Sequence, residues 1–177
     1  NKPFFIMGYI NIEIKARTSR ALQIRQYLVT HGAAYIGTDL QTDTYFNVPH
    51  GRLKLREGNI ENNLIFYDRN NQAGPKQSVF SLFPVDQPVL LKEIMSNALG
   101  KKVIVQKTRE IYFINNVKFH LDLVDGLGEF VEIEASNKSA DLPVEVLKEQ
   151  CSFYMKAFEI QENDLINHSY SDMLTES

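Results

Sequence analysis

The stretch VKFHLDLVDGLGEFVEIEA, residues 117–135, contains two strand-like runs joined by a glycine-containing turn. In both runs, residues 117–123 and 130–135, charged or polar side chains alternate with apolar ones. Because successive side chains of a β-strand point to opposite faces of its sheet, each run has one charged face and one apolar face. The charged faces carry Lys118, His120 and Asp122 in the first run, and Glu132 and Glu134 in the second. The pattern predicts two antiparallel strands connected at residues 125–128.

Two runs nearer the N-terminus show the same alternation. Residues 10–16 place Asn11, Glu13 and Lys15 on one face, and residues 51–57 do so with Arg52, Lys54 and Arg56. Further strand-like runs cover residues 42–48, 63–68, 76–82, 102–109 and 110–114. The intervening turn residues, among them Asn115 and Asn116 as a hairpin turn tolerant of positive φ, predict a meander of strands.

Three segments show helical patterns, at residues 20–31, 88–99 and about 143–158. Ser19 is the expected N-cap of the first helix and Asp141 that of the third, while Gly32 and Gly100 mark helix ends. Residues 160–177 are expected to form a C-terminal latch, and residues 1–8 a tag remnant or frayed end. The elements predict one α+β domain over residues 1–177.

Composition excludes several functional classes. The chain has 177 residues, a net charge of -3 and no long apolar run, which argues against nucleic acid and membrane partners. Its single cysteine, Cys151, lies in a helical pattern and predicts a buried structural thiol, because no disulfide can form within the chain. These features favour a cytoplasmic location, and a homodimer is left open.

The charged strand faces allow two interpretations. Each could be the wet face of an ordinary antiparallel sheet, or all could line a common lumen while helices cover the apolar outer faces. The proposed inward set is Lys15, Arg52, Lys54, Arg56, Lys76, Lys107, Arg109 and Lys118 with Glu13, Asp122, Glu132 and Glu134. A net charge of +4 in a confined space calls for a polyanion, and a triphosphate with a divalent cation suits both subsets of side chains.

The order and spacing of these motifs resemble the CYTH superfamily of triphosphate tunnel metalloenzymes. The matching segments are Asn11-Ile-Glu13-Ile-Lys15, Asp43-Thr-Tyr45-Phe46, Arg52-Leu-Lys54-Leu-Arg56-Glu57, Gly74-Pro75-Lys76, Lys107-Thr-Arg109, His120-Leu-Asp122, Gly126-Leu-Gly128 and Glu132-Ile-Glu134. The C-terminal residues 169–174 are similar to the tail of class IV adenylyl cyclase-like members. One position departs from the family's E-x-E-x-K signature, since Asn11 stands where the motif has Glu. An amide oxygen binds a hard dication less well than a carboxylate does.

The resemblance implies an eight-stranded antiparallel β-barrel, or tunnel, with helices packed on its outer faces. It implies Mg²⁺ or Mn²⁺ held by Glu13, Glu132 and Glu134, and Asp122 nearby as a metal ligand or general base. The phosphates would be held by Lys15, Lys54, Arg56, Lys76, Lys107 and Arg109, with Lys15 also counted as catalytic beside Asp122. The alternation of side chains along the strands, without support from the resemblance, adds Arg52 and Lys118 to the phosphate-binding set. His120 is expected to make a lumen-wall hydrogen bond more readily than to transfer a proton.

Three functions are compatible with such a site. The resemblance favours a metal-dependent adenylyl cyclase that converts ATP to cyclic AMP and pyrophosphate. A triphosphatase acting on thiamine triphosphate, tripolyphosphate or nucleotides is the alternative, and a non-catalytic binder of phosphorylated ligands is the third. Residues 70–75, Tyr45 and Phe80 are the candidates to cover a nucleoside.

Overall fold

The computed structural model describes residues 9–68, 76–138 and 141–175. For Tyr9 and residues 76–80 it describes the backbone alone. The predictions made for residues 1–8 and 70–75 lie outside the described residues.

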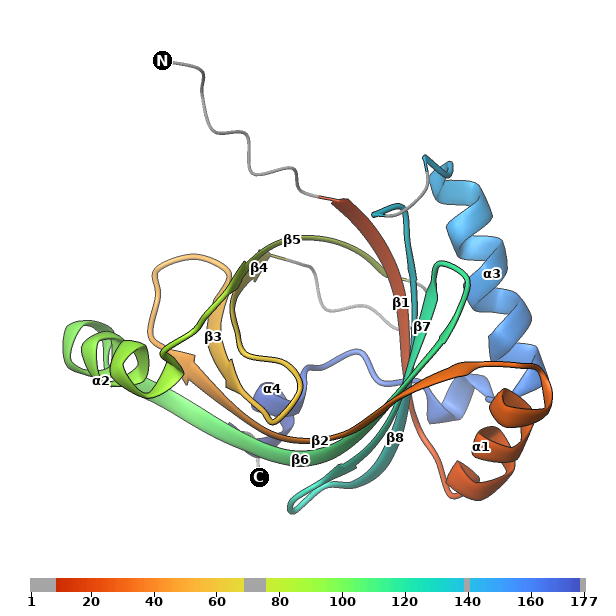
Figure 1. The fold of residues 1–177 in the computed structure, drawn as a ribbon, viewed down its shortest axis with the longest axis horizontal. Helices are drawn as coiled ribbons and strands as arrows, with labels where there is room; N and C mark the ends of the chain where they lie inside the picture. The colour runs from red at the N-terminus through yellow and green to blue at the C-terminus, as the bar shows by residue number, and fades with distance from the viewer. Residues whose placement is uncertain (1–8, 69–75, 139–140, 176–177) are drawn as a thin grey trace.

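Eight strands form a closed antiparallel barrel, seen as a ring in Figure 1. They are β1 (Tyr9–Arg17), β2 (Ala34–Phe46), β3 (Arg52–Glu57), β4 (Asn63–Asp68), β5 (Lys76–Pro84), β6 (Lys101–Ile114), β7 (Val117–Val124) and β8 (Gly128–Ser136). Around the barrel the order is β1-β5-β4-β3-β2-β6-β7-β8, and β1 closes the ring by pairing with both β5 and β8. The predicted eight-stranded antiparallel tunnel with external helices is confirmed.

The longest strands differ from the sequence prediction. The runs 102–109 and 110–114 are one continuous strand, β6, and β2 begins at Ala34 instead of residue 42. These two strands pair with each other from Ala34 opposite Phe113 to Phe46 opposite Lys101, so each supports the full length of the other. The turn prediction is confirmed, since Asn115 between β6 and β7 has a φ of 52°.

The helices are α1 (Ala21–Thr30), α2 (Pro88–Leu99), α3 (Val144–Ala157) and α4 (Tyr170–Thr175), with a 3₁₀ turn η1 (Glu162–Asp164). Both predicted N-caps are wrong. Arg20 occupies the cap position of α1, where its backbone N–H donates to Thr18 Oγ1 instead of a Ser19 side chain capping the helix. Pro143 occupies the cap position of α3, two residues beyond Asp141. The bounds of α2 match the prediction, with Gly100 following at a φ of 75°.

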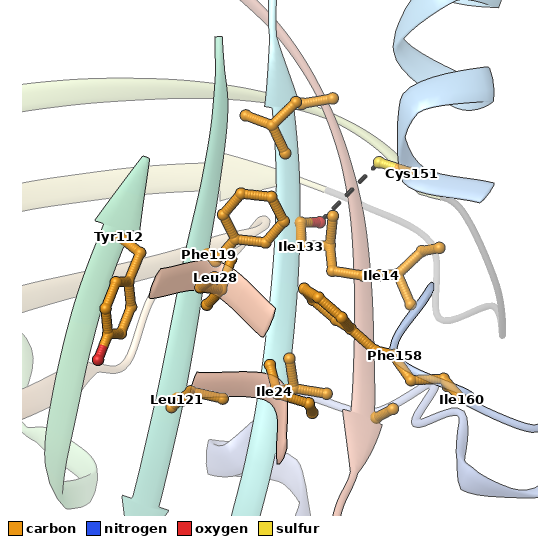
Figure 2. Close-up of a cluster of buried hydrophobic side chains, with 14 of the residues drawn as sticks. Ile14, Ile24, Leu28, Tyr112, Phe119, Leu121, Ile133, Cys151, Phe158 and Ile160 are labelled. Carbon is orange, nitrogen blue, oxygen red and sulfur yellow. Dashed lines mark hydrogen bonds between the residues drawn. The ribbon is translucent and has the colours of Figure 1, made fainter. Parts of the chain in front are cut away.

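The main hydrophobic core lies outside the barrel. Helices α1 and α3 cover the outer faces of β1, β7 and β8, on the opposite side of the ring from α2 (Figure 1). Figure 2 shows Ile14, Phe119 and Ile133 of these strands packed with Leu28 of α1. Cys151 is buried in the same cluster (Figure 2). Its thiol donates to the Ile12 carbonyl at 3.2 Å, which agrees with a structural thiol.

Helical cover of the outer surface is incomplete. Thr44 of β2 and Leu55 of β3 are fully buried on the side where α2 packs. On the same pair of strands, however, Leu40 of β2 is 66% exposed, and Ile104 of β6, which pairs with Thr44, is 46% exposed. The helices therefore pack on the outer faces as predicted, but they leave some apolar side chains of β2 and β6 exposed. No helix in the described ranges is long and apolar enough to span a membrane.

The C-terminal segment attaches to β1 before it reaches the end of the barrel. Ala16 and Leu165 form an isolated antiparallel bridge, and the Ile166 N–H donates to the Lys15 carbonyl at 2.9 Å. Helix α4 then packs against β6, and its first residue, Tyr170, is buried. The segment thus brings Tyr170 beneath the charged interior of the barrel.

Truncation of Leu147 on α3 tests whether the external core stabilises the barrel. Leu147 is fully buried against the strands, so Leu147→Ala should lower the free energy of unfolding by about 2–5 kcal/mol. Phe153→Ala on the same helix is the control, because Phe153 is 60% exposed and its loss should cost well under about 1 kcal/mol. Denaturant titrations of both variants measure the difference, and equal losses would contradict this placement of the core.

Candidate functional site

A cavity of about 540 Å³ runs through the barrel and is lined by the charged strand faces. Its cations are Lys15, Lys54, Arg56, Lys107, Arg109, Lys118 and Lys138, and its carboxylates are Glu13, Asp43, Glu61, Glu132 and Glu134. These seven cations and five carboxylates give the described lining a net charge of +2. The charged faces therefore form a lumen, and the alternative of a wet outer face does not hold for them.

Asp43 of β2 is the centre of the first charge cluster. Its carboxylate accepts hydrogen bonds from Lys54 at 3.0 Å, from Lys107 at 2.8 Å, and from Arg56 at 2.8 and 2.9 Å. Burial alone would raise the pKa of Asp43, but the cations Arg56, Lys107 and Lys54 hold it well below its usual range. Asp43 thus stays ionised and fixes three predicted phosphate-binding side chains from two strands.

Glu132 of β8 is the centre of the second charge cluster. Its carboxylate contacts Lys15 at 2.8 Å, Arg109 at 2.9 Å and His120 Nδ1 at 3.0 Å. Burial raises the pKa of Glu132, whereas Lys15 and Arg109 lower it, and the net direction is well below the usual value. With three partners around it, Glu132 positions two predicted phosphate ligands in addition to any role toward a metal.

Asp122 lies behind this cluster and not on the cavity surface. Arg109 donates to both of its oxygens, at 2.7 and 2.5 Å, and the Tyr170 hydroxyl donates to Oδ2 at 2.8 Å. In this conformation Asp122 orients Arg109, and a general-base role would require Tyr170 to leave. Tyr170 also lies 3.7 Å, measured to its ring centre, from the Lys15 ammonium.

The structure brings most of the predicted site residues together. Lys15, Lys54, Arg56, Lys107, Arg109, Glu13, Glu132 and Glu134 line the cavity, as does Lys118. Arg52 instead pairs with Asp172 of α4 at 2.8 Å. Lys76 begins β5 opposite Glu13, but its side chain lies outside the described part of the chain.

Sequence reasoning missed Glu61, a cavity carboxylate between β3 and β4. It contacts Lys118 at 2.5 Å and Arg56 at 3.0 Å. Because Glu61 belongs to a loop, strand alternation carries no signal for it. Tyr170 belongs to the predicted latch, residues 160–177, but its position in the cavity wall follows from no local pattern either.

The cavity offers oxygen ligands for a divalent metal. Glu13 and Glu134 are directly opposite each other in the β1–β8 pair, and Asn11 faces Ser136 one inward position along. Asn11 is 3% exposed, and its Oδ1 has no hydrogen-bond partner among the residues that the structure describes. His120, Glu132 and Glu134 also have ligand atoms within 4.8 Å of one another. Two carboxylates beside an unsatisfied amide oxygen suit a hard cation such as Mg²⁺ or Mn²⁺.

One wall of the cavity is apolar and aromatic. Tyr45, Ile65, Tyr67 and Leu82 line it from β2, β4 and β5. The Lys54 ammonium lies 5.5 Å from the ring centre of Tyr45 and 5.9 Å from that of Tyr67. An apolar surface therefore adjoins the cations of the Asp43 cluster.

The closed barrel with inward-facing cations and carboxylates defines a tunnel-type domain. The sequence profile of the CYTH domain matches residues 9–170, so the chain belongs to the CYTH family. Members of this family act on triphosphates and depend on divalent metals.

Individual proteins are similar to this one over nearly the whole chain. A protein of Methanocaldococcus jannaschii named "putative adenylate cyclase" is 26% identical over 181 residues, which cover 93% of this chain and 98% of the relative. A solved protein of Pyrococcus horikoshii aligns with a TM-score of 0.79 at 24% identity, covering 92% of this chain and 98% of its own. A protein from Hippeastrum is described as an adenylyl cyclase candidate with a dominant triphosphatase activity. It aligns with a TM-score of 0.65 at 16% identity, covering 94% of each chain.

Substitutions at the β1–β8 pair test the metal site. Glu134→Gln should weaken Mn²⁺ binding at least about tenfold, because it removes an anionic oxygen ligand. Asn11→Glu should tighten it by restoring a carboxylate beside Glu13. Calorimetric titration with Mn²⁺ measures both effects, with Glu129→Gln on the same strand as the control because Glu129 is exposed. Unchanged affinity in both cavity variants would rule out this ligand set.

Lys107 predicts a pH dependence of anion binding. Burial lowers the pKa of Lys107 to about 7, although Asp43 favours its charged form. Below pH 7 Lys107 is therefore charged in the free protein, and above pH 7 it must take up a proton to pair with a phosphate. In EDTA, wild-type protein should take up about one proton per tripolyphosphate at pH 8, and Lys107→Arg should take up less because a guanidinium stays charged.

Calorimetry in two buffers of different ionisation enthalpy measures this uptake. The protonation of tripolyphosphate itself contributes equally for the wild-type protein and for Lys107→Arg. A difference in proton uptake between the two proteins therefore comes from position 107. The same proton uptake in both proteins at pH 8 would show that Lys107 does not titrate in this range.

Proposed function

We propose that the protein is a metal-dependent adenylyl cyclase that converts ATP to cyclic AMP and pyrophosphate. The observation that carries the proposal is the wall formed by Tyr45, Ile65, Tyr67 and Leu82, which adjoins the phosphate-binding cations. A cyclase must hold the nucleoside so that its 3′-oxygen lies in line with the α-phosphorus. Apolar and aromatic side chains beside Lys54 provide a surface on which a nucleobase or ribose can pack.

The proposed mechanism assigns separate tasks to the two charge clusters. Lys54, Arg56 and Lys107 around Asp43 bind phosphate oxygens next to the nucleoside wall. Lys15 and Arg109 around Glu132 stabilise the negative charge that develops as pyrophosphate leaves. A divalent metal held by Glu13 and Glu134 with Asn11 supplies further charge neutralisation when bound.

The reaction also needs an acceptor for the proton of the 3′-hydroxyl. Asp122 is the base that the family resemblance suggests, but Arg109 and Tyr170 occupy its oxygens. His120 lines the cavity, and burial together with Arg109 lowers its pKa, which keeps the imidazole neutral. A neutral imidazole can accept the proton directly. We therefore propose His120 as a candidate base in addition to Asp122.

A triphosphatase is the second candidate. Its support is the Hippeastrum protein, which has the same fold and is described as predominantly a triphosphatase. Hydrolysis needs the cations and the metal but no nucleoside wall.

The partner that we propose is a small-molecule triphosphate. A cytoplasmic location and a homodimer are proposals as well.

Product analysis separates the candidates. Incubation with ATP should give cyclic AMP and pyrophosphate, faster with Mn²⁺ than with Mg²⁺ because Asn11 replaces an anionic ligand by an amide. Tripolyphosphate should bind and stay intact, since it lacks the nucleoside. Tyr67→Ala should weaken binding of ATP about tenfold or more and leave binding of tripolyphosphate nearly unchanged.

Other products would lead to other conclusions. Orthophosphate as the sole product, with tripolyphosphate turned over faster than ATP, would identify a triphosphatase. Tight binding of both ATP and tripolyphosphate without any product under either metal would identify a non-catalytic binder.

A further inference from the structure

Glu61 forms ion pairs with two cations of the cavity that lie on non-adjacent strands. Arg56 on β3 donates to its Oε2 at 3.0 Å, and Lys118 on β7 donates to its Oε1 at 2.5 Å. In the barrel order, β3 and β7 are separated by β2 and β6, so the side chain bridges the lumen. Burial raises the pKa of Glu61, but Lys118 and Arg56 hold it well below its usual range, so the carboxylate is ionised.

The loop that carries Glu61 is fixed at its backbone. Asp39 of β2 is fully buried and accepts from the N–H of Ile60 at 2.8 Å and of Glu61 at 3.0 Å. Gly58 packs so closely on this carboxylate that a Cβ at position 58 would lie 2.5 Å from Asp39 Oδ1. Gln41 donates to both Asp39 and Glu61. The backbone thus aims the Glu61 side chain into the lumen, and a displacement of Glu61 would move the side chain alone.

Glu61 differs in this respect from Asp43. The Asp43 side chain is 2% exposed and is held by four hydrogen bonds from three cations on neighbouring strands. The Glu61 side chain is 20% exposed, longer, and lies on a loop. Of these two carboxylates, Glu61 is the one that can leave its cations at the smaller cost.

We propose that Glu61 is an internal competitor for phosphate, which holds Arg56 and Lys118 in the unliganded protein and is displaced by the bound polyphosphate. The inference rests on the proposed function, because it assumes that phosphates bind these cations. A chain anchored at Lys54 and Lys107 presents its next phosphoryl group to Arg56 and Lys118 at a high effective concentration. A single phosphate has no such anchor, so Glu61 selects for polyphosphates over short anions.

The test compares binding of tripolyphosphate in EDTA by wild-type protein and by Glu61→Gln. Glutamine keeps the size of the side chain and removes the competing charge, so the variant should bind roughly tenfold more tightly, the order expected from one partly buried charge. Glu57→Gln is the matched control, because it makes the same change of net charge on β3, where Glu57 pairs with Lys92 outside the cavity lining. Its affinity should equal that of the wild type.

A second variant checks that the competition takes place at Lys118. If Glu61 blocks this cation, the gain from Glu61→Gln should shrink in a Lys118→Met background, because one of the released partners is missing. A gain of the same size in both backgrounds would overturn the assigned contact.

The remaining outcomes separate the inference from the proposed function. Equal affinity of wild type and Glu61→Gln would overturn the inference alone. No binding of tripolyphosphate by either protein would overturn the proposed function and the inference with it. If Glu61→Gln binds the complex of Mg²⁺ with tripolyphosphate more weakly than the wild type does, Glu61 is a metal ligand. That result would also overturn the inference.

Discussion

The buried carboxylate of Asp43, shared by three cations, is the interaction on which the interior of the barrel depends. Placing Lys54, Arg56 and Lys107 in a confined space without compensation would oppose folding, because each buried charge loses its hydration. Asp43 supplies the compensation at the centre of the group, and Glu132 does the same for Lys15 and Arg109. The lumen can therefore be assembled before any ligand enters, with its cations already oriented toward a common volume.

This solution separates stability from function in space. The inward positions of the strands carry charge, so the hydrophobic core has to form on the outer faces, where α1 and α3 pack on β1, β7 and β8. Ile12 and Ile14 stabilise the fold, while Glu13 between them and Lys15 after them face the cavity. Binding residues can thus change in charge or length without disturbing the main core.

Strand alternation explains why much of this arrangement could be predicted from the sequence. A period of two assigns Lys54, Arg56, Glu132 and Glu134 to one face before any contact is known. It could not place Glu61, whose direction is set by the hydrogen bond that its backbone N–H donates to Asp39, 22 residues earlier in the chain. Nor could it show that Tyr170 covers Asp122, because that contact joins segments 48 residues apart. Local pattern determines which face a side chain takes, and long-range packing determines whether the cavity reaches it.

The second cluster also limits how the role of any single residue can be defined. Glu132 contacts Lys15, Arg109 and His120, and Arg109 in turn holds Asp122, which accepts from Tyr170. Removal of one member leaves its partners buried with an unpaired charge or donor, so the measured loss includes their rearrangement. Effects of substitutions within such a network are not additive. Roles in this tunnel are therefore properties of pairs, and double-mutant cycles are the measurement that can assign them.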